Sequence, residues 1–392
     1  MESKFNDNLL TIKLCNRIDT NNALKVEEEI FSIINSSNGV NSLVLDANEL
    51  EYISSAGLRL ILKLKKTIDN FKIINVSNDV YETFDMTGFS EIMDISKRFR
   101  ELDVSNAKII GEGAKGIVYR YSDELIVKVY KHSESIDEIN REHELARKAF
   151  ILGIPTALSF SVCKVGDKFA TVFELLDATS VTQEIANNKS SLDKWAKISA
   201  DLLKQIHSTP IKEGEVEDNK YDVLRRLLNL KDALTEEEYQ KLEKMINDVP
   251  DCHFLIHGDF HTNNIMVQNG EVLLIDMDTL AMGNPVFELA NVYIAYVGFG
   301  IFDPKKVENF LKLDYETAKI FFDKFINYYM PDYNEDVLNK LKLLSYMRFY
   351  HHIKKRNKGT EEEINNMNTL VKFIKELLTK VDKLSLWVNN LR

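Results

Sequence analysis

The sequence feature that most constrains the fold is a run of polar side chains followed by a short apolar strand. Residues 257–264 read His-Gly-Asp-Phe-His-Thr-Asn-Asn, and residues 272–275 read Val-Leu-Leu-Ile directly before Asp276. Between them, residues 268–271 read Gln-Asn-Gly-Glu, which predicts a tight hairpin turn. The hairpin would bring the polar loop and the end of the strand into one site.

The residue types in this hairpin are those that phosphoryl transfer requires. That reaction needs a carboxylate beside the acceptor hydroxyl and oxygen ligands for a magnesium ion that bridges the phosphates. We expect Asp259 to accept the hydroxyl proton, and Asn264 and Asp276 to bind the metal. His257 is expected to order the loop through hydrogen bonds, and Asp278 to support it. The alternative is a polar loop whose Asp and Asn side chains only cap turns.

A glycine-rich segment upstream fits the same chemistry. Residues 111–118 follow the pattern GxGxxGxV, and apolar β-branched residues come next instead of a helical pattern. Gly111, Gly113 and Gly116 are therefore predicted in a strand–turn–strand, where the missing side chains would let backbone N–H groups approach the phosphates of ATP. An ordinary glycine-rich hairpin is the alternative.

A lysine in the middle of an apolar strand supplies the next element. Lys128 lies within residues 125–130, and burying its charge is costly unless an anion pairs with it. We expect Lys128 to hold the ATP phosphates while a helix carboxylate orients its ammonium group. Glu142 is favoured over Glu144, because its neighbours on the helix face are apolar. In the alternative, Lys128 faces outward and both glutamates lie in solvent.

The order of elements predicts two different domains. In the first hundred residues strands alternate with helices, which predicts an α/β domain with a mostly parallel or mixed sheet. The strands are expected at 9–14, 42–46 and 71–76, and the helices at 23–35, 54–67 and 80–87. From residue 107 antiparallel strands precede a helix over 136–151, and the chain is mainly helical from about residue 192. Residues 213–222 are expected to form a surface loop.

Composition excludes several classes of protein. The net charge of −11 argues against a nucleic-acid binder, because phosphate backbones attract the opposite charge. The three cysteines form no CxxC pair, which suits a reducing compartment. The first residues lack the apolar core of a signal peptide, and the apolar stretch 289–302 is too short to span a membrane. We therefore expect a cytoplasmic protein with no membrane partner.

In their order, these motifs resemble the aminoglycoside phosphotransferase and choline kinase-like superfamily, whose catalytic loop typically reads HGDxHxxN with a following IDxD. The resemblance covers about residues 107–300. It implies an α+β, two-lobed protein-kinase-like domain, with the N-lobe at 107–176 and a mainly helical C-lobe at 177–392. It also implies ATP and Mg²⁺ as cofactors, with Glu174 and Leu176 in the hinge that holds adenine.

The resemblance further implies the acceptor. His-Gly-Asp stands where protein kinases usually carry His-Arg-Asp, which favours a hydroxyl group of a small molecule of the aminoglycoside, sugar or amino-alcohol type. Helices beyond Pro285 are expected to line the acceptor pocket. The aromatic and basic segment 344–352 is interpreted as core packing.

The first domain resembles STAS domains, the fold of anti-sigma factor antagonists, through Leu-Val-Leu-Asp at 43–46, the segment 52–62 and the segment 84–89. This STAS-like domain is expected at residues 1–100, and residues 101–106 form a linker. Aligned on the glycine of the family's motif, the phosphorylatable serine falls on Ser55. The aspartate that usually precedes it is replaced by Ser54, and both serines could instead be helix N-caps.

Three functions remain open at this point. The favoured one is a small-molecule phosphotransferase with a regulatory STAS-like domain, to which a regulatory protein could bind. The second is a regulatory protein kinase acting on a STAS-domain serine. The third is a nucleotide-binding regulator without turnover.

Overall fold

The structure, a computed structural model, describes residues 1–37, 39–113, 115–131, 135–356 and 358–386. The chain divides into two compact units, Met1–Asp103 and Val104–Arg392, and the division falls within the predicted linker segment. Each unit contains a hydrophobic core of its own.

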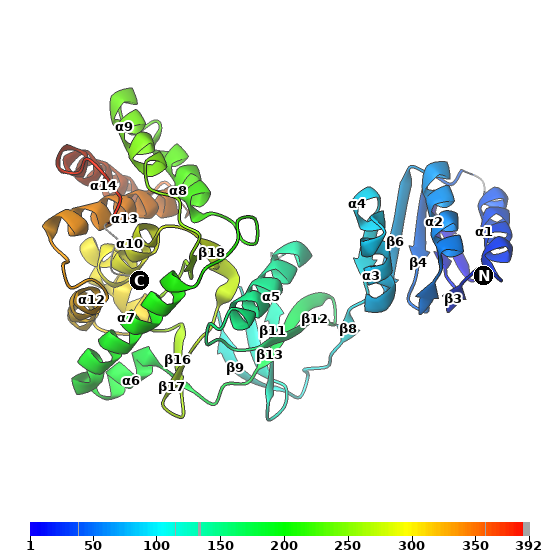
Figure 1. The fold of residues 1–392 in the computed structure, drawn as a ribbon, viewed down its shortest axis with the longest axis horizontal. Coiled ribbons are helices and arrows are strands. Elements are labelled where there is room, and N and C mark those ends of the chain that lie inside the picture. The colour runs from blue at the N-terminus through cyan, green and yellow to red at the C-terminus, as the bar shows by residue number, and fades with distance from the viewer. Residues whose placement is uncertain (38, 114, 132–134, 357, 387–392) are drawn as a thin grey trace. The chain divides into compact units, whose positions relative to one another are not determined.

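In the first unit, strands alternate with helices (Figure 1). Its elements are β1 (Ser3–Asn6), β2 (Leu9–Lys13), β3 (Arg17–Ile18), α1 (Ala23–Ser36), β4 (Ser42–Asp46), β5 (Tyr52–Ile53), α2 (Ser55–Thr67), β6 (Asn70–Val76), α3 (Asn78–Met86), α4 (Phe89–Ile92), β7 (Asp94–Lys97) and β8 (Arg100–Glu101). The main sheet has the order β1-β2-β4-β6-β7. Only β1 is antiparallel to its neighbour, so the predicted α/β fold with a mostly parallel sheet is confirmed.

One face of this sheet supplies the core. Leu10 and Ile12 of β2 and Leu43 and Leu45 of β4 are buried, while the residues between them are partly exposed. Successive side chains of a strand point to opposite faces of the sheet, so this alternation means that one face packs against the helices.

One side chain of α1 departs from the sequence prediction. The pattern assigns Leu24 to the apolar face of the helix, but 70% of Leu24 is exposed. The buried residues are Ala23, Val26 and Ile30, which follow the three- and four-residue spacing of one helix face. Leu24 is two residues from Val26, more than half a turn, and therefore points away from the core.

The second unit begins with an antiparallel sheet. Its strands are β9 (Lys108–Glu112), β10 (Gly116–Arg120), β11 (Leu125–Tyr130), β12 (Ser159–Val165) and β13 (Lys168–Glu174), in the spatial order β12-β13-β11-β10-β9. Helix α5 (Ile136–Ile151) packs against β12 and β13. Ser135 and Glu138 form a capping box at the start of α5, which fixes where the helix begins.

The rest of the second unit is mainly helical, as predicted. Its strands are β14 (Thr179–Ser180), β15 (Leu255–Ile256), β16 (Ile265–Gln268), β17 (Glu271–Leu274) and β18 (Ala281–Met282). Its α-helices are α6 (Val181–Asn187), α7 (Leu192–Ser208), α8 (Asn219–Leu227), α9 (Glu236–Asn247), α10 (Pro285–Tyr296), α11 (Pro304–Leu311), α12 (Tyr315–Tyr329), α13 (Glu335–Arg356) and α14 (Glu361–Lys380). Together with the preceding sheet, these elements form the predicted two-lobed kinase-like fold.

Two local boundaries have clear physical causes. The hairpin of β16 and β17 turns at Asn269 and Gly270, whose φ angles of 54° and 87° are those of a type I′ turn. The predicted surface loop at 213–222 is too long, because Asp218 accepts a hydrogen bond from the N–H of Lys220 and starts α8 at Asn219.

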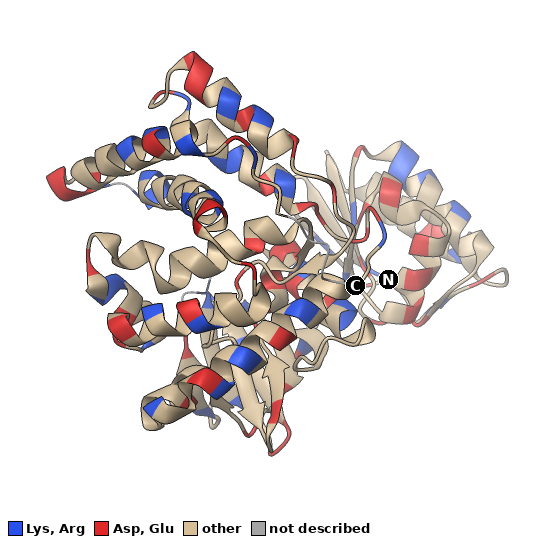
Figure 2. Cartoon of the chain, turned by 60° about the vertical axis from the view of Figure 1, so that its left-hand side comes forward, with Lys and Arg blue, Asp and Glu red and all other residues tan. Residues whose placement is uncertain are grey.

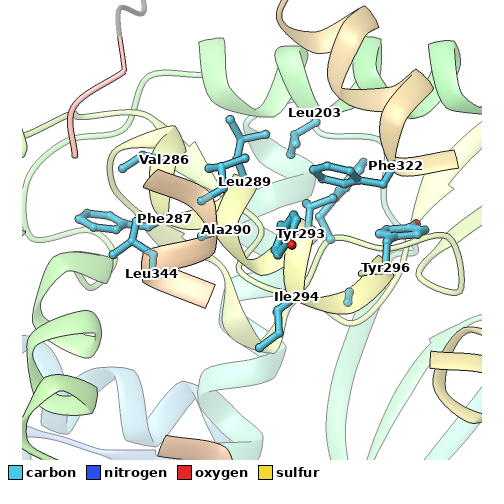
Figure 3. Packing of buried hydrophobic residues seen from close by; sticks show 14 of the residues in the cluster. Leu203, Val286, Phe287, Leu289, Ala290, Tyr293, Ile294, Tyr296, Phe322 and Leu344 are labelled. Carbon is cyan, nitrogen blue, oxygen red and sulfur yellow. The ribbon is translucent and has the colours of Figure 1, made fainter. Parts of the chain in front are cut away.

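Helix α10 lies at the centre of the helical lobe. All twelve of its residues are buried, so it has no polar face. Figure 3 shows Leu289, Tyr293 and neighbouring residues of α10 packed against Leu203 of α7, Phe322 of α12 and Leu344 of α13. A polar group on α10 must therefore find its partner inside the protein.

The surface carries both signs of charge. Lys and Arg residues are interspersed with Asp and Glu residues along the outer helices (Figure 2). No helix among the described residues has the length and apolar character needed to cross a bilayer.

The close approach of β10 to β11 gives a first test. A Cβ atom on Gly116 would lie 2.4 Å from the carbonyl oxygen of Val129. We expect Gly116→Ala to lower the free energy of unfolding by about 1–3 kcal/mol, the usual cost of overpacking. Gly113→Ala is the matched control, because a Cβ at Gly113 meets no atom within 4 Å. Chemical denaturation measures both variants, and equal stabilities would contradict this explanation of Gly116.

Candidate active site

A cleft of about 450 Å³ opens between the antiparallel sheet and the β16–β17 hairpin. Eight of the residues predicted from the sequence line it: Gly111, Gly113, Lys128, Glu142, Glu174, Leu176, Asn264 and Asp276. Apolar side chains, including Val118, Ile126 and Met266, line it as well. Gly116 and Asp259 are not among the lining residues.

Lys128 and Glu142 form a pair inside this cleft. Lys128 Nζ lies 2.6 Å from Glu142 Oε1 and 3.8 Å from Asp276 Oδ1. Glu142 is buried on α5, whereas Glu144 is exposed. The ion pair therefore joins β11 to α5 and directs the ammonium group toward the end of β17.

The end of β13 forms the edge of the cleft. The backbone N–H of Leu175 donates to the carbonyl oxygen of Glu124 at 2.7 Å. The carboxylate of Glu174 accepts a hydrogen bond from the backbone N–H of Leu158 at 3.2 Å. These bonds hold the predicted hinge to the two neighbouring segments of the same lobe.

A buried carboxylate on α10 binds the backbone of the polar loop. Glu288 Oε2 accepts the backbone N–H of His257 at 2.8 Å, and its Oε1 accepts that of Gly258 at 2.6 Å. Glu288 is fully buried, so water cannot replace either bond. Two consecutive N–H groups on one carboxylate fix both the position and the direction of the loop.

Glu288 has a third partner in the core. His207 Nε2 lies 2.9 Å from Glu288 Oε2, and His207 Nδ1 lies 2.7 Å from the hydroxyl of Tyr329. Because a carboxylate oxygen accepts, Nε2 carries the proton, and the Tyr329 hydroxyl donates to Nδ1. The chain Tyr329–His207–Glu288 thus connects α12 and α7 to the loop.

Gly258 is required by the geometry of the loop. Its φ of 84° lies in the left-handed region, and a Cβ there would lie 2.5 Å from the carbonyl oxygen of Thr279. The hydroxyl of Thr279 donates to the carbonyl oxygen of His257 at 2.8 Å. The loop therefore passes so close to the segment after β17 that no side chain fits at this position.

Asp259 follows this glycine and is 38% exposed. Its Oδ2 lies 3.5 Å from His261 Nε2. Burial opposes ionisation, but the hydrogen bond from His261 and the charges of His261, Arg348 and His257 outweigh it and lower the pKa of Asp259 to about 2. Asp259 is therefore a carboxylate throughout the neutral pH range.

Asn264 and Asp276 are brought together by the backbone. The N–H of Ile275 donates to the carbonyl oxygen of Asn264 at 3.0 Å, and Asn264 Nδ2 donates to the carbonyl oxygen of Asp259 at 3.0 Å. The second bond orients the amide so that its nitrogen is occupied while Oδ1 remains available as a ligand. A carboxylate and an amide oxygen facing one cleft form a donor set that suits Mg²⁺.

Several residues of this region lie outside the motifs predicted from the sequence. Lys115, in the glycine segment, forms an ion pair with Asp278, which connects that segment to the strand end beyond the hairpin. Glu288 could have been suspected, since it is an acidic residue beside a long apolar stretch. His207 had no local signal, because its partners are 81 and 122 residues away in the sequence.

A second cavity, of about 400 Å³, adjoins the loop. It is lined by Gly258, Asp278 and Thr279, and shares Glu142 with the first cleft. A larger hollow of about 1210 Å³ lies along α5 and the loop before α8, and none of the predicted site residues lines it. We therefore locate the candidate active site at the two smaller cavities.

Comparison with protein-family models gives two matches. A model described as Phosphotransferase enzyme family matches residues 106–318, and the STAS domain model matches residues 1–102. A curated relative, "Putative anti-sigma factor antagonist BtrV" of Bordetella bronchiseptica (strain ATCC BAA-588 / NCTC 13252 / RB50), is 30% identical over 94 residues. The match covers 23% of this chain and 79% of that protein, so the first unit is a STAS domain.

Solved structures of kinases also align with the chain. ADP-bound aminoglycoside phosphotransferase APH(2'')-Ib aligns with a TM-score of 0.49 and 17% identity, covering 77% of this chain and 99% of that chain. A choline/ethanolamine kinase family protein from Mesorhizobium loti aligns with a TM-score of 0.44 and 11% identity, covering 70% of this chain and 92% of that chain.

The contacts of Glu288 give a test of the loop. In Glu288→Gln the side-chain nitrogen would face a backbone N–H, so one of the two loop bonds is lost. We expect the free energy of unfolding to fall by about 1–3 kcal/mol. Hydrogen exchange of the backbone amides of residues 257–264 should become faster. Glu271→Gln, on the exposed turn of the hairpin, is the control; unchanged exchange in Glu288→Gln would show that the loop does not depend on this carboxylate.

Proposed function

Because the chain belongs to the phosphotransferase enzyme family, we propose that it transfers the γ-phosphoryl group of magnesium-bound ATP to a hydroxyl group of a small molecule. The observation that carries the proposal is that Lys128, Glu142, Asn264 and Asp276 line one cleft, beside the loop that bears Asp259. In the sequence these residues come from four separate segments, and phosphoryl transfer uses their side chains together.

The sheet lobe binds the nucleotide. The ammonium group of Lys128, oriented by Glu142, holds the phosphates, and the backbone of Gly111 and Gly113 covers them. Adenine occupies the apolar part of the cleft next to Glu174 and Leu176. Since the Glu174 carboxylate bonds to Leu158 N–H, the hinge offers the base its backbone rather than this side chain.

The hairpin holds the metal. Asn264 Oδ1 and the carboxylate of Asp276 bind Mg²⁺, which supplies charge neutralisation to the phosphates when bound. Lys128 lies 3.8 Å from Asp276, so the lysine and the metal ligands act on the same phosphate groups.

Asp259 orients the acceptor. Its carboxylate accepts a hydrogen bond from the acceptor hydroxyl and aims the oxygen at the phosphorus atom. With a pKa of about 2, Asp259 is a weak base, so its main contribution is alignment rather than early removal of the proton. This suits a loose transition state, in which the hydroxyl proton leaves late. The cavity beside Gly258 and Thr279 receives the rest of the acceptor.

Replacing Asp259 gives the main test. We expect Asp259→Asn to lower acceptor-dependent ATP consumption by about a hundredfold or more, the usual cost of misaligning a reacting group. Binding of a non-hydrolysable ATP analogue should be nearly unchanged, because Asp259 does not line the nucleotide cleft. The assay is magnesium-dependent ADP release against a panel of aminoglycosides, sugars and amino alcohols.

Asp232→Asn is the matched control, since the Asp232 side chain is 93% exposed. Full activity of Asp259→Asn would contradict the mechanism. ATP binding with no consumption for any acceptor would instead favour a nucleotide-binding regulator.

A second candidate function concerns the STAS domain. Ser54 accepts the N–H of Ala56 at 3.2 Å and is the N-cap of α2, whereas Ser55 is the exposed first residue of that helix. Of the two serines, only Ser54 therefore caps the helix. A phosphate on Ser55 would face the N–H groups and positive end of α2, which favours it. The kinase domain would then act on Ser55, or on the corresponding serine of a partner protein.

Mass spectrometry after incubation with Mg²⁺ and ATP tests this candidate. We expect one phosphate per chain, absent in Ser55→Ala and in Asp259→Asn but retained in Ser54→Ala. An unmodified chain that still consumes ATP with a small acceptor would eliminate self-phosphorylation and leave the small-molecule reaction intact.

A further inference from the structure

Four arginines line the cavity that receives the acceptor, and two of them, Arg226 and Arg348, are partly buried. Arg226 of α8 and Arg348 of α13 line the cavity of about 400 Å³, together with Gly258 and Thr279 beside the catalytic loop. The segment around Arg348 was predicted to be core packing, and Met347 and Phe349 are indeed buried in the core. Arg348, which lies between them in the sequence, instead lines the cavity.

Arg348 has no direct partner among the described residues. Its Nη1 atom is buried, and no hydrogen bond or ion pair of its guanidinium occurs in the part of the chain that the structure describes. Burial lowers the pKa of Arg348, and the more distant charges of Asp259, Asp222 and Glu288 oppose that shift. A buried guanidinium without a bonded anion is unfavourable for folding.

Arg226 shares its carboxylate partner, Asp222, with another arginine. Asp222 forms ion pairs with Arg226 and, at 3.1 Å, with Arg225. Burial and the nearby charge of Arg348 lower the pKa of Arg226 to about 10, although Asp222 opposes this. One carboxylate therefore faces two guanidinium groups, and a third lies close by.

The other charged groups of the cavity are already engaged. Lys115 pairs with Asp278, and Arg141 pairs with Glu217 at 3.0 Å. The carboxylates of Glu138 and Asp218 accept backbone N–H groups at the starts of α5 and α8. Backbone N–H groups do not neutralise these two carboxylates, so the cavity as a whole is not positive. Its distinguishing feature is Arg348, whose guanidinium bonds to no carboxylate among the described residues.

Asn219 contributes a further polar atom to this cavity. Asn219 lines the same cavity, and its buried Oδ1 has no hydrogen-bond partner among the described residues. Buried polar atoms normally have partners, so this oxygen is suited to accept a bond from a polar ligand.

We propose that Arg226 and Arg348 bind an oxyanion, a carboxylate or a phosphate, carried by the acceptor whose hydroxyl faces Asp259. The proposal rests on the proposed phosphotransferase function and narrows its substrate class. The planar fork of a guanidinium group matches both oxyanions with two parallel hydrogen bonds. Hydroxy acids and phosphorylated polyols carry such an oxyanion together with a hydroxyl group, whereas an aminoglycoside carries no oxyanion.

The test compares small acceptors that differ mainly in charge. Glycerol, glycerate, glycerol 3-phosphate and choline are titrated into the full chain with Mg²⁺ and a non-hydrolysable ATP analogue, and binding is measured by calorimetry. We expect at least one of the two anions to bind about tenfold or more tightly than glycerol. Glycerol has no oxyanion and cannot form the charge-assisted hydrogen bonds to the arginines. The comparison of glycerate with glycerol 3-phosphate separates carboxylate from phosphate.

Variants test whether Arg226 and Arg348 cause the preference for the anion. Arg348→Met should remove the preference for the anion, and Arg348→Lys should retain part of it. Arg147→Met is the control, because its side chain is 51% exposed and lines neither of the two smaller cavities, and it should change the affinity less than about twofold. Circular dichroism shows whether Arg348→Met folds. If it folds poorly, Arg226→Met replaces it in the test, because this variant should also lose the preference for the anion.

Several results would overturn the proposal. These are equal binding of glycerol and both anions, tightest binding of choline, no saturable binding of either anion, or a preference that survives in Arg348→Met. If Arg348 only keeps Asp259 ionised, Arg348→Met lowers turnover but leaves anion binding unchanged, which also overturns it. Because the readout is binding, none of these outcomes bears on whether Asp259 supports phosphoryl transfer.

Discussion

The candidate site depends on one buried carboxylate. Glu288 accepts two consecutive backbone N–H groups of the catalytic loop and bonds to His207 in the core. Since α10 is buried along its whole length, this carboxylate could not be solvated in any other way. The cost of burying its charge is offset only when the loop is in position, so folding of the core and ordering of the loop are coupled.

The site is then completed by short-range bonds within and between the lobes of the second unit. The pair of Lys128 and Glu142 fixes β11 to α5, and the backbone bond between Ile275 and Asn264 fixes the loop to the hairpin end. Lys115 and Asp278 connect the glycine segment to that same end. Lys128 and the predicted metal ligands Asn264 and Asp276 therefore line one cleft, although Lys128 and Asp276 are 148 positions apart in the sequence.

The sequence predicted the parts of this site that local pattern determines. The loop with Asp259 and Asn264, the turn at Asn269-Gly270 and the buried lysine each carry a signal within a few residues. His207 and Arg348 carry none, because their roles come from partners far away in the sequence. Glu288 has one weak signal, its position beside a long apolar stretch. Arg348 lies in an aromatic helix segment whose other members do pack in the core, so its different orientation depends on tertiary structure. Gly116 was interpreted as a phosphate-binding residue, yet contact with Val129 already excludes a side chain there.

The central claim is that the sheet lobe and the hairpin form one metal–nucleotide site facing Asp259. A crystal structure of the full chain with Mn²⁺ and a non-hydrolysable ATP analogue tests it most directly, since Mn²⁺ scatters anomalously and accepts the oxygen ligands of Mg²⁺. The account predicts an anomalous peak bound by Asn264 Oδ1 and Asp276, with Lys128 on the phosphates and the γ-phosphate directed toward Asp259. A nucleotide bound outside this cleft, or a metal held by His257 and His261 instead, would contradict it.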